Sequence, residues 1–293
     1  MFNYLIHGLQ VSSDFDLLID QNSEHASLHR TKISKNQELV IPENFYGKDF
    51  FLESCFNKSK VIQKDIFYAE INNTGNNVHI KQLSSKACKT DIARRIFNLV
   101  MPFVLYQKKR LVLHSSAINI SGKTILFLGN SGAGKSSAAS FFSESIFLSD
   151  DVVSISFRDS SPQAYPAFPY IKLTESVAKV TSFSKGIELK NDRLSRLFYK
   201  VKNFSYDSKT LNYCIFLKWD EFNNIKKLDS TEILQCVVAS QIGAYPLNSC
   251  DESSKILMNS ISKLSQNVDF YEITRKKEQK SFNFLRSFID NLE

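Results

Sequence analysis

Short apolar runs alternate with polar turns over the first part of the chain. The runs lie at residues 4–6, 16–19, 39–41, 66–71 and 78–80. Between the last two, Asn72-Asn73-Thr74-Gly75 is typical of a tight hairpin turn. The pattern therefore predicts a small β-rich N-terminal domain over residues 1–90.

The spacing of apolar residues becomes helical near residue 91. Apolar side chains recur at intervals of three and four positions, at Ile92, Ile96, Leu99, Val100, Phe103 and Val104. Thr90 or Asp91 suits the start of this helix, and Pro102 predicts a kink within it or an early end. We expect a linking helix over residues 91–110.

Strands and helices mix in the remainder of the chain, residues 111–293. Periodicity predicts strands at 111–120 and 124–128 around a turn at Ser121-Gly122, and further strands at 146–148, 152–157, 211–219 and 268–274. Helices are predicted at 136–145, 174–181, 230–240, 253–266 and 279–292, and a loop at 162–169. We therefore expect an α/β fold for this part of the chain.

The composition argues against a disordered or a fibrous protein. The chain has 293 residues, 43% of them apolar and 23% charged, which is close to globular averages. The net charge of +7 is scattered in short clusters, so we expect no nucleic-acid partner. The longest near-apolar run, residues 96–106, is far shorter than the ~20 residues that cross a bilayer. Together with five cysteines that show no paired spacing, this favours a cytoplasmic protein with no membrane partner.

One motif carries clear chemistry. Residues 129–136 match the Gly-x-x-x-x-Gly-Lys-Ser pattern of a phosphate-binding loop, between an apolar strand and a helix. Glycines let backbone N–H groups converge on phosphate oxygens, Lys135 adds positive charge, and the Ser136 hydroxyl can complete a Mg²⁺ shell. The predicted ATP-binding residues are Gly129, Asn130, Ser131, Gly132, Ala133, Gly134, Lys135, Ser136 and Ser137. The alternative is a structural glycine turn.

Two adjacent acids follow the loop at a short distance. Asp150 and Asp151 come after the apolar run at 146–148, fifteen residues beyond Lys135, which leaves room for one helix and a return strand. One of the two carboxylates can then hold Mg²⁺ or accept a proton near the bound phosphate. From the pair alone, a solvated turn is the competing interpretation.

At this point the chain resembles the HPr kinase/phosphorylase family, whose core is shared with ATP-dependent phosphoenolpyruvate carboxykinase. The resemblance implies an α/β P-loop core of that kind, with mixed sheets rather than a doubly wound parallel sheet. The resemblance runs over about 40 residues, through Leu113-His114-Ser115-Ser116-Ala117, the loop at 129–136 and Leu148-Ser149-Asp150-Asp151. The opening Tyr4-Leu5-Ile6-His7-Gly8-Leu9 is also similar to the HPr-kinase-like proteins of peptide-modification clusters, lasso peptide kinases included.

The resemblance implies roles for three residues beside the loop. Asp150 would accept the proton of the acceptor hydroxyl, Asp151 together with Ser136 would support the metal, and His114 would adjust Asp150 through a hydrogen bond. Without the resemblance, a lone histidine in an apolar strand is more often structural. The catalytic residues expected on this basis are Asp150, His114 and Lys135.

Other features leave two interpretations open. Further phosphate contacts can come from cations that are otherwise ordinary surface residues, namely Lys172, Arg193, Arg196, Lys200 and Arg275. The aromatic segment at 165–170 either lines an acceptor cleft or packs as a surface loop.

These observations predict an ATP- and Mg²⁺-dependent kinase that transfers the γ-phosphoryl group to a hydroxyl. The expected acceptor is a serine of a peptide or small protein. The alternatives are a small-molecule kinase acting on free serine or a sugar, and a nucleotide-dependent protein that binds a peptide without modifying it. The sequence leaves the oligomeric state open, a homo-oligomer included.

Overall fold

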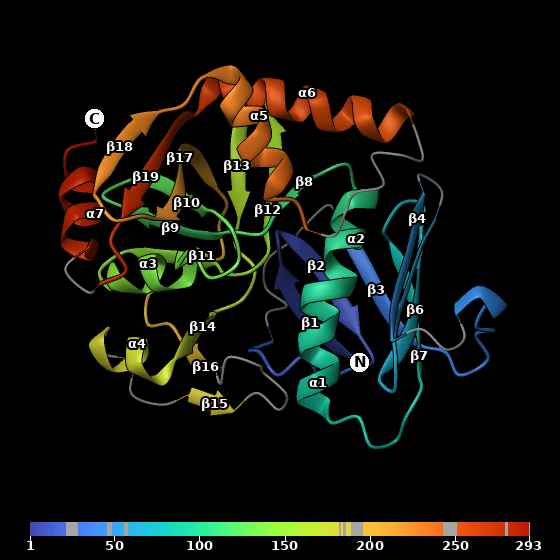
Figure 1. Cartoon of the computed structure of the whole chain (residues 1–293). Coiled ribbons are helices and arrows are strands. Elements are labelled where there is room, and N and C mark those ends of the chain that lie inside the picture. Colours follow the sequence, from blue (N-terminus) through green and yellow to red (C-terminus); the bar gives the residue numbers. More distant parts are fainter. Residues whose placement is uncertain are drawn as a thin grey trace.

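The computed structural model describes residues 1–21, 29–45, 49–55, 58–181, 183, 186–188, 196–242, 251–278 and 281–292. Their strands form sheets of seven, nine and three strands, and helices cover the faces of the two larger sheets (Figure 1). The protein is thus a mixed α/β structure. Of the helices within the described ranges, none combines the length and the apolar character that crossing a bilayer requires.

The seven-stranded sheet takes all its strands from the N-terminal residues. Its order is β1-β2-β3-β7-β6-β5-β4, with β2, β3 and β7 running parallel and the other neighbours antiparallel. The strands are β1 (Phe2–Ile6), β2 (Leu9–Ser13), β3 (Arg30–Lys35), β4 (Phe50–Cys55), β5 (Lys58–Gln63), β6 (Phe67–Asn72) and β7 (Asn77–Gln82), with a short 3-10 helix, η1 (Glu43–Phe45), before β4. The predicted hairpin at residues 72–75 joins β6 and β7. The predicted runs at 16–19 and 39–41 are not strands.

A helical segment packs its apolar side chains against one face of this sheet. It consists of α1 (Lys89–Arg95), the π-helical turn η2 (Ile96–Val100) and α2 (Met101–Gln107). The early end that Pro102 suggested does not occur. Its ring would clash with the carbonyl of Asn98 in an α-helix, whereas in the π-helical turn the Met101 N–H donates to the carbonyl of Ile96. The N-cap is Cys88, not Thr90 or Asp91.

The nine-stranded sheet has the order β11-β9-β10-β17-β13-β12-β8, with β19 pairing β17 and β18. Only β10, β17 and β19 run parallel; the remaining described pairs are antiparallel, so the expected mixed sheet is confirmed. The strands are β8 (Leu111–Leu113), β9 (Ser116–Ile120), β10 (Lys123–Leu128), β11 (Ile146–Ser149), β12 (Val153–Arg158), β13 (Ser161–Tyr165), β17 (Lys209–Trp219), β18 (Asn224–Lys227) and β19 (Asp269–Arg275).

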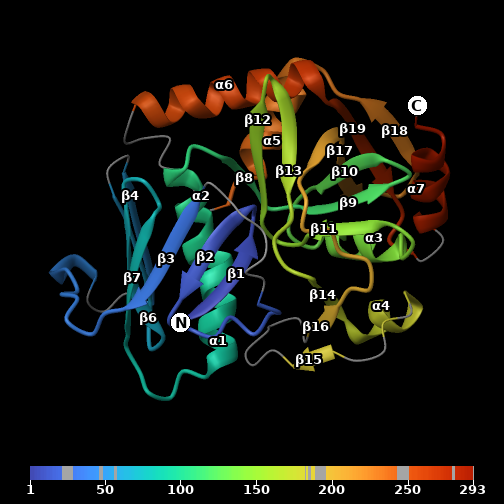
Figure 2. The ribbon, with the colours of Figure 1, turned by 180° about the vertical axis from the view of Figure 1, so that it is seen from behind.

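Helices cover both faces of the nine-stranded sheet (Figures 1 and 2). One core lies under α5 (Ser230–Ala239) and α6 (Asp251–Asn267). The other lies between the sheet, α3 (Lys135–Phe141), α4 (Glu175–Val180) and α7 (Ser281–Asp290). A small sheet of β14 (Tyr170–Thr174), β16 (Arg196–Lys200) and β15 (Gly186–Glu188) extends this second core.

The loop predicted at 162–169 is partly wrong, because β13 occupies Ser161–Tyr165. Three prolines, Pro162, Pro166 and Pro169, lie in the segment predicted as a loop. Pro162 stands next to the first residue of the strand and pairs only with β12, while β13 meets β17 through Gln163 and Ala164. A proline there removes no hydrogen bond from the interior of the sheet. The division into domains at 1–90, 91–110 and 111–293 stays a prediction.

A tight turn docks the seven-stranded sheet onto the nine-stranded one. His7 and Gly8 join β1 to β2 with φ angles of 54° and 65°. The His7 N–H donates to the carbonyl of Pro166 at 2.7 Å, and the His7 carbonyl accepts from Arg110. A Cβ at Gly8 would lie 2.6 Å from the Tyr165 ring, so only glycine allows this close contact. The His-Gly pair of the N-terminal sequence therefore has a structural explanation.

We expect His7 to make stability depend on pH. Burial, and secondly the charge of Arg110, lower its pKa from 6.5 to about 3. Between these two values the unfolded chain binds a proton at this position and the folded chain does not. The free energy of unfolding therefore falls as pH drops below 6.5, by about 1.4 kcal/mol per pH unit at most.

Chemical denaturation of wild type and His7→Asn between pH 7 and pH 4 checks this expectation. Asparagine tolerates the positive φ of the turn but does not titrate. The variant should lose less free energy of unfolding than wild type over this range, by roughly 3 kcal/mol at most. Parallel curves for the two proteins would contradict the assignment.

Candidate active site

The glycine-rich loop joins β10 to α3 in a conformation that requires its glycines. Gly129, Gly132 and Gly134 have φ angles of 138°, 84° and 85°, which side chains with a Cβ rarely adopt. Asn130, Ser131 and Gly132 are exposed at the tip. The predicted strand-loop-helix context is thus present, although the helix is shorter than expected.

Lys135 folds back into the loop. Its Nζ donates to the carbonyls of Gly129 at 2.9 Å and Asn130 at 3.3 Å, and the residue is only 7% exposed. Burial lowers the pKa of this ammonium, and the nearby charges of Asp150 and Asp151 partly oppose the shift. A buried cation held on carbonyl oxygens is well placed to receive an anion at the loop.

A tryptophan and an arginine brace the loop from behind. Trp219 Nε1 donates to the carbonyl of Gly132 at 2.8 Å, and Arg275 Nη2 donates to the carbonyl of Ala133 at 3.0 Å. The Arg275 guanidinium lies 4.0 Å from the centre of the Trp219 ring and is fully buried. Burial lowers its pKa to about 10. The interpretation of Arg275 as a surface cation is therefore wrong. Its guanidinium contacts the loop backbone.

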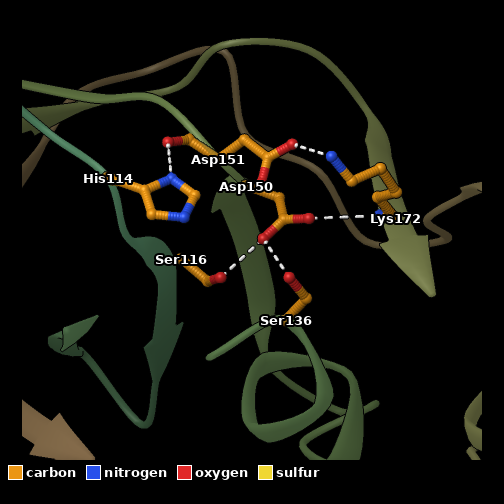
Figure 3. Close-up of polar contacts among 6 residues, drawn as sticks. All are labelled: His114, Ser116, Ser136, Asp150, Asp151 and Lys172. Atoms are coloured by element: carbon orange, nitrogen blue, oxygen red, sulfur yellow. Dashed lines mark hydrogen bonds and ion pairs between the residues drawn. The ribbon is translucent and has the colours of Figure 1, made fainter. Parts of the chain in front are cut away.

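A strained turn separates the two acids. Asp151 has a φ of 65°, and the N–H of Val152 donates to the carbonyl of Asp150 at 2.8 Å, so the three residues form a γ-turn. Figure 3 shows that Asp150 contacts Ser116, Ser136 and Lys172, whereas the Asp151 carboxylate contacts Lys172 alone among the residues drawn. Strain of this kind is often found at functional sites.

Asp150 points toward the loop. Its Oδ1 accepts hydrogen bonds from Ser116 at 2.5 Å and Ser136 at 2.8 Å, and its Oδ2 accepts the backbone N–H of Lys172 at 3.1 Å (Figure 3). The side chain is buried, and burial followed by the charge of Asp151 raises its pKa. The three hydrogen bonds favour the charged form and oppose this shift.

Asp151 and His114 lie on the other side of the turn. Asp151 Oδ2 forms an ion pair with Lys172 Nζ at 2.6 Å. Burial acts to raise the pKa of Asp151, but the charge of Lys172, together with His114, lowers it overall. His114 Nδ1 lies 2.9 Å from the backbone carbonyl of Asp151, so the tautomer with a proton on Nδ1 donates there. The expected hydrogen bond from His114 to the Asp150 carboxylate is not formed.

The structure pairs Ser136 with Asp150, whereas the resemblance paired it with Asp151. A hydroxyl and a carboxylate oxygen are ligands that Mg²⁺ accepts, and it usually completes its shell with phosphate oxygens and water. The described residues contain no group of three or more His, Cys, Asp or Glu that would hold an ion by themselves. Ser136 and Asp150 therefore fit a metal ion that binds together with a nucleotide.

A cavity of about 390 Å³ lies beside these groups. The loop borders it through residues 129–131, and His114, Asp151 and Lys172 border it as well. Its remaining walls come from Asn98, Val152 and residues 239–242. A space next to both the phosphate loop and an ionised carboxylate is where an acceptor group would meet a phosphoryl group.

The fold thus brings together Lys135, Ser136, Asp150, Asp151 and His114, which the sequence had singled out. Of the candidate cations, Lys172 belongs to the site and is not a surface residue, while Lys200 is exposed and pairs with Asp20. Arg196 is near enough to act electrostatically on Asp151, and Arg193 lies outside the described residues. Ser116 lies in the segment that carries the resemblance but was given no role, and no sequence pattern singled out Asn98 or Gln241.

The aromatic segment at 165–170 does not border this cavity. Tyr165 stacks on Arg110, and Phe168 stacks on Phe97 with ring centres 4.3 Å apart. Its side chains join the two large sheets instead of forming an acceptor cleft.

Comparison with known proteins yields little. No protein-family model matches the chain, and no curated protein matches it. Among solved structures 94 chains match, one of them the Hpr(Ser) kinase/phosphatase from Coxiella burnetii. The two chains are 12% identical, the alignment covers 61% of this chain and 94% of that chain, and the TM-score is 0.34. So low a TM-score says nothing about the activity, which has to be inferred from the residues of the site.

Three glycines with almost the same φ allow a test of whether packing of Trp219 and Arg275 against the loop stabilises the protein. Gly122, Gly132 and Gly134 have φ angles of 83°, 84° and 85°. A Cβ meets nothing within 4 Å at Gly122 or Gly132, but at Gly134 it would lie 2.8 Å from Arg275 and 3.0 Å from Trp219. Alanine at any of the three adds backbone strain of about 1 kcal/mol, and only Gly134→Ala adds a clash.

We expect Gly134→Ala to lower the free energy of unfolding at least twice as much as Gly122→Ala, and to weaken ATP binding. Chemical denaturation and calorimetric titration with ATP measure the two effects. Gly122→Ala is the control for strain outside the loop and should bind ATP as wild type does. Equal losses of unfolding free energy in Gly134→Ala and Gly122→Ala would show that the packing of Trp219 and Arg275 against the loop does not contribute to stability.

Proposed function

We propose that the protein is an ATP-dependent phosphotransferase that transfers the γ-phosphoryl group to a hydroxyl, in particular to a serine of a peptide or small protein. One observation carries the proposal: a single cavity is bordered both by the glycine-rich loop and by Asp151, with Lys172 and His114 beside it. These groups suffice for phosphoryl transfer without a covalent bond to the protein, because the reaction depends mainly on positioning and on charge stabilisation.

The loop would hold the phosphates. Backbone N–H groups of the loop would bind phosphate oxygens, since its three glycines adopt positive φ angles; the Ala133 N–H already donates to the carbonyl of Asn130 at 3.0 Å and is not among them. Lys135 Nζ, held on the carbonyls of Gly129 and Asn130, would move its charge onto the β and γ phosphates. Trp219 and Arg275 would keep the loop in this shape before the nucleotide arrives.

Ser136 and Asp150 would hold the magnesium ion. The ion would neutralise phosphate charge when bound. Asp150 is kept in place by Ser116 and by the backbone N–H of Lys172, so its Oδ1 stays next to Ser136. A cation at this point would also offset the unfavourable burial of the Asp150 carboxylate.

Asp151 would receive the proton of the acceptor hydroxyl. Asp151 borders the cavity, and its carboxylate is ionised at neutral pH because Lys172 and His114 lower its pKa. As the acceptor oxygen bonds to the γ-phosphorus, the bond to the ADP oxygen breaks and the hydroxyl proton passes to Asp151. His114 acts as a positioning residue, since its ring nitrogen fixes the Asp151 carbonyl within the γ-turn. These roles exchange the two acids relative to the family resemblance.

Matched variants of the two acids test both the function and the roles. Asp151→Asn keeps a residue that tolerates a positive φ, so the turn survives, and we expect normal Mg-ATP binding with transfer reduced about 10²- to 10⁴-fold. Asp150→Asn and Ser136→Ala should both weaken ATP binding in the presence of Mg²⁺, with little effect in its absence. Titration with ATP, with and without Mg²⁺, measures the binding.

Transfer is measured as ADP release and as a gain of ~80 Da in seryl peptides, the mass of one added phosphoryl group. If Asp150→Asn binds Mg-ATP normally but transfers nothing, the roles of the acids are the reverse of those proposed. If wild type binds ATP but modifies no hydroxyl compound, among peptides, free serine and sugars, the enzyme proposal fails. Nucleotide-dependent peptide binding without a mass change would then identify a binding protein.

Lys135→Ala should lower turnover more than it changes acceptor affinity. The ammonium stabilises charge on the phosphates and does not border the acceptor cavity. Steady-state kinetics with varied acceptor at saturating ATP give kcat and KM separately. A variant with unchanged kcat and a raised acceptor KM would contradict this role.

A further inference from the structure

Two side chains that border the cavity are not used by the transfer chemistry. Asn98 comes from the π-helical turn η2, and Gln241 follows the end of α5. The same lining includes Asp151, Lys172 and the glycine-rich loop. The cavity therefore combines ionic groups with two neutral carboxamides from outside the loop.

Gln241 is fixed beside the candidate active site by the backbone. The backbone N–H of His114 donates to the carbonyl of Ser240 at 2.6 Å, and Leu113 forms an antiparallel bridge with Gln241. The side-chain nitrogen Nε2 of Gln241 is shielded from solvent and has no hydrogen-bond partner. An unpaired buried N–H destabilises the free protein, so a partner supplied by a ligand would explain why it is kept.

Asn98 lies in an unusual helical turn. A π-helical turn is rare, and such turns are frequent at functional sites. This one accommodates Pro102 and places the half-buried Asn98 on the cavity wall. Within the described residues, the Asn98 side chain makes no hydrogen bond. A second carboxamide with free donor and acceptor atoms thus borders the same space as Gln241.

Resting on the function proposed above, we infer that Asn98 and Gln241 form the acceptor subsite and bind the peptide groups that flank the reacting hydroxyl. Each carboxamide offers one N–H donor side and one oxygen acceptor, which complements the N–H and C=O of a peptide bond. Neither residue is charged, which suits a neutral backbone. The described lining contains no Phe, Tyr or Trp on which a nucleobase would stack.

The test uses variants of nearly equal volume that lack hydrogen-bonding groups, Asn98→Leu and Gln241→Met. The acceptor probe is acetyl-alanyl-seryl-alaninamide, and glycerol serves as a hydroxyl acceptor without amide groups. We expect each variant to raise the KM of the peptide about tenfold, with smaller changes in kcat, in the KM of ATP and in the phosphorylation of glycerol. Asn224→Leu and Gln266→Met, at exposed positions that do not border the cavity, are the matched controls.

A melting experiment separates an acceptor role from a structural one. Because Gln241→Met removes an unpaired buried N–H, the variant should unfold at the same or a higher temperature than wild type while it binds the peptide more weakly. A residue kept only for the fold would show the opposite, a lower unfolding temperature with unchanged peptide KM, and that result would overturn the inference.

Equilibrium binding distinguishes failure of this inference from failure of the proposed function. Saturation-transfer NMR measures binding of the peptide to the protein loaded with Mg²⁺ and a non-hydrolysable ATP analogue. If wild type binds the peptide, the two variants bind it less and no transfer occurs, the subsite stands and the kinase proposal falls. If wild type does not bind the peptide, or both variants bind it as wild type does, the subsite assignment is wrong.

Discussion

Two adjacent carboxylates buried in one place are the constraint on which the candidate site depends. Asp150 and Asp151 would repel each other and lose hydration if they pointed the same way. The γ-turn at Asp151 gives them different main contacts, although Lys172 binds both: its backbone N–H donates to Asp150 and its ammonium pairs with Asp151. Hydroxyl groups of β9 and α3 donate hydrogen bonds to Asp150, while the ammonium of Lys172 in β14 forms an ion pair with Asp151. The positions of these three elements are therefore tied to a single strained residue.

The conformation of the glycine-rich loop depends on a second buried charge, that of Arg275. Arg275 makes no ion pair within the described residues and is held by the Trp219 ring and by a loop carbonyl. The carbonyls of Gly132 and Ala133 accept from Trp219 and Arg275, so these two oxygens do not face an anion held by the loop. The loop is thus preorganised for an anion by cations that lie behind and within it, which reduces the rearrangement that binding requires.

Local patterns predicted the local parts of this site and little else. The loop at 129–136 and the turn at Ser121-Gly122 were predictable because the chemistry of glycine acts within a few residues. Ser116 and Lys172, by contrast, reach Asp150 and Asp151 only through sheet pairing and the packing of β14, over separations of 34 and 21 residues. Which acid faces Ser136 is decided by one φ angle, and no residue pattern specifies that angle. The resemblance therefore named residues that the fold brings together, but it did not specify their orientation.

The N-terminal sheet contributes to the site through the helical segment that it supports. Apolar side chains of α1, η2 and α2 pack on this sheet, and the His7-Gly8 turn locks the sheet against β13 and the chain after it. Both contacts fix where η2 runs, and η2 brings Asn98 to the cavity. Since Pro102 prevents a regular α-helix at this point, the π-helical turn sets the position of Asn98 along the wall. In this way a sheet whose described residues do not border the cavity positions part of its wall.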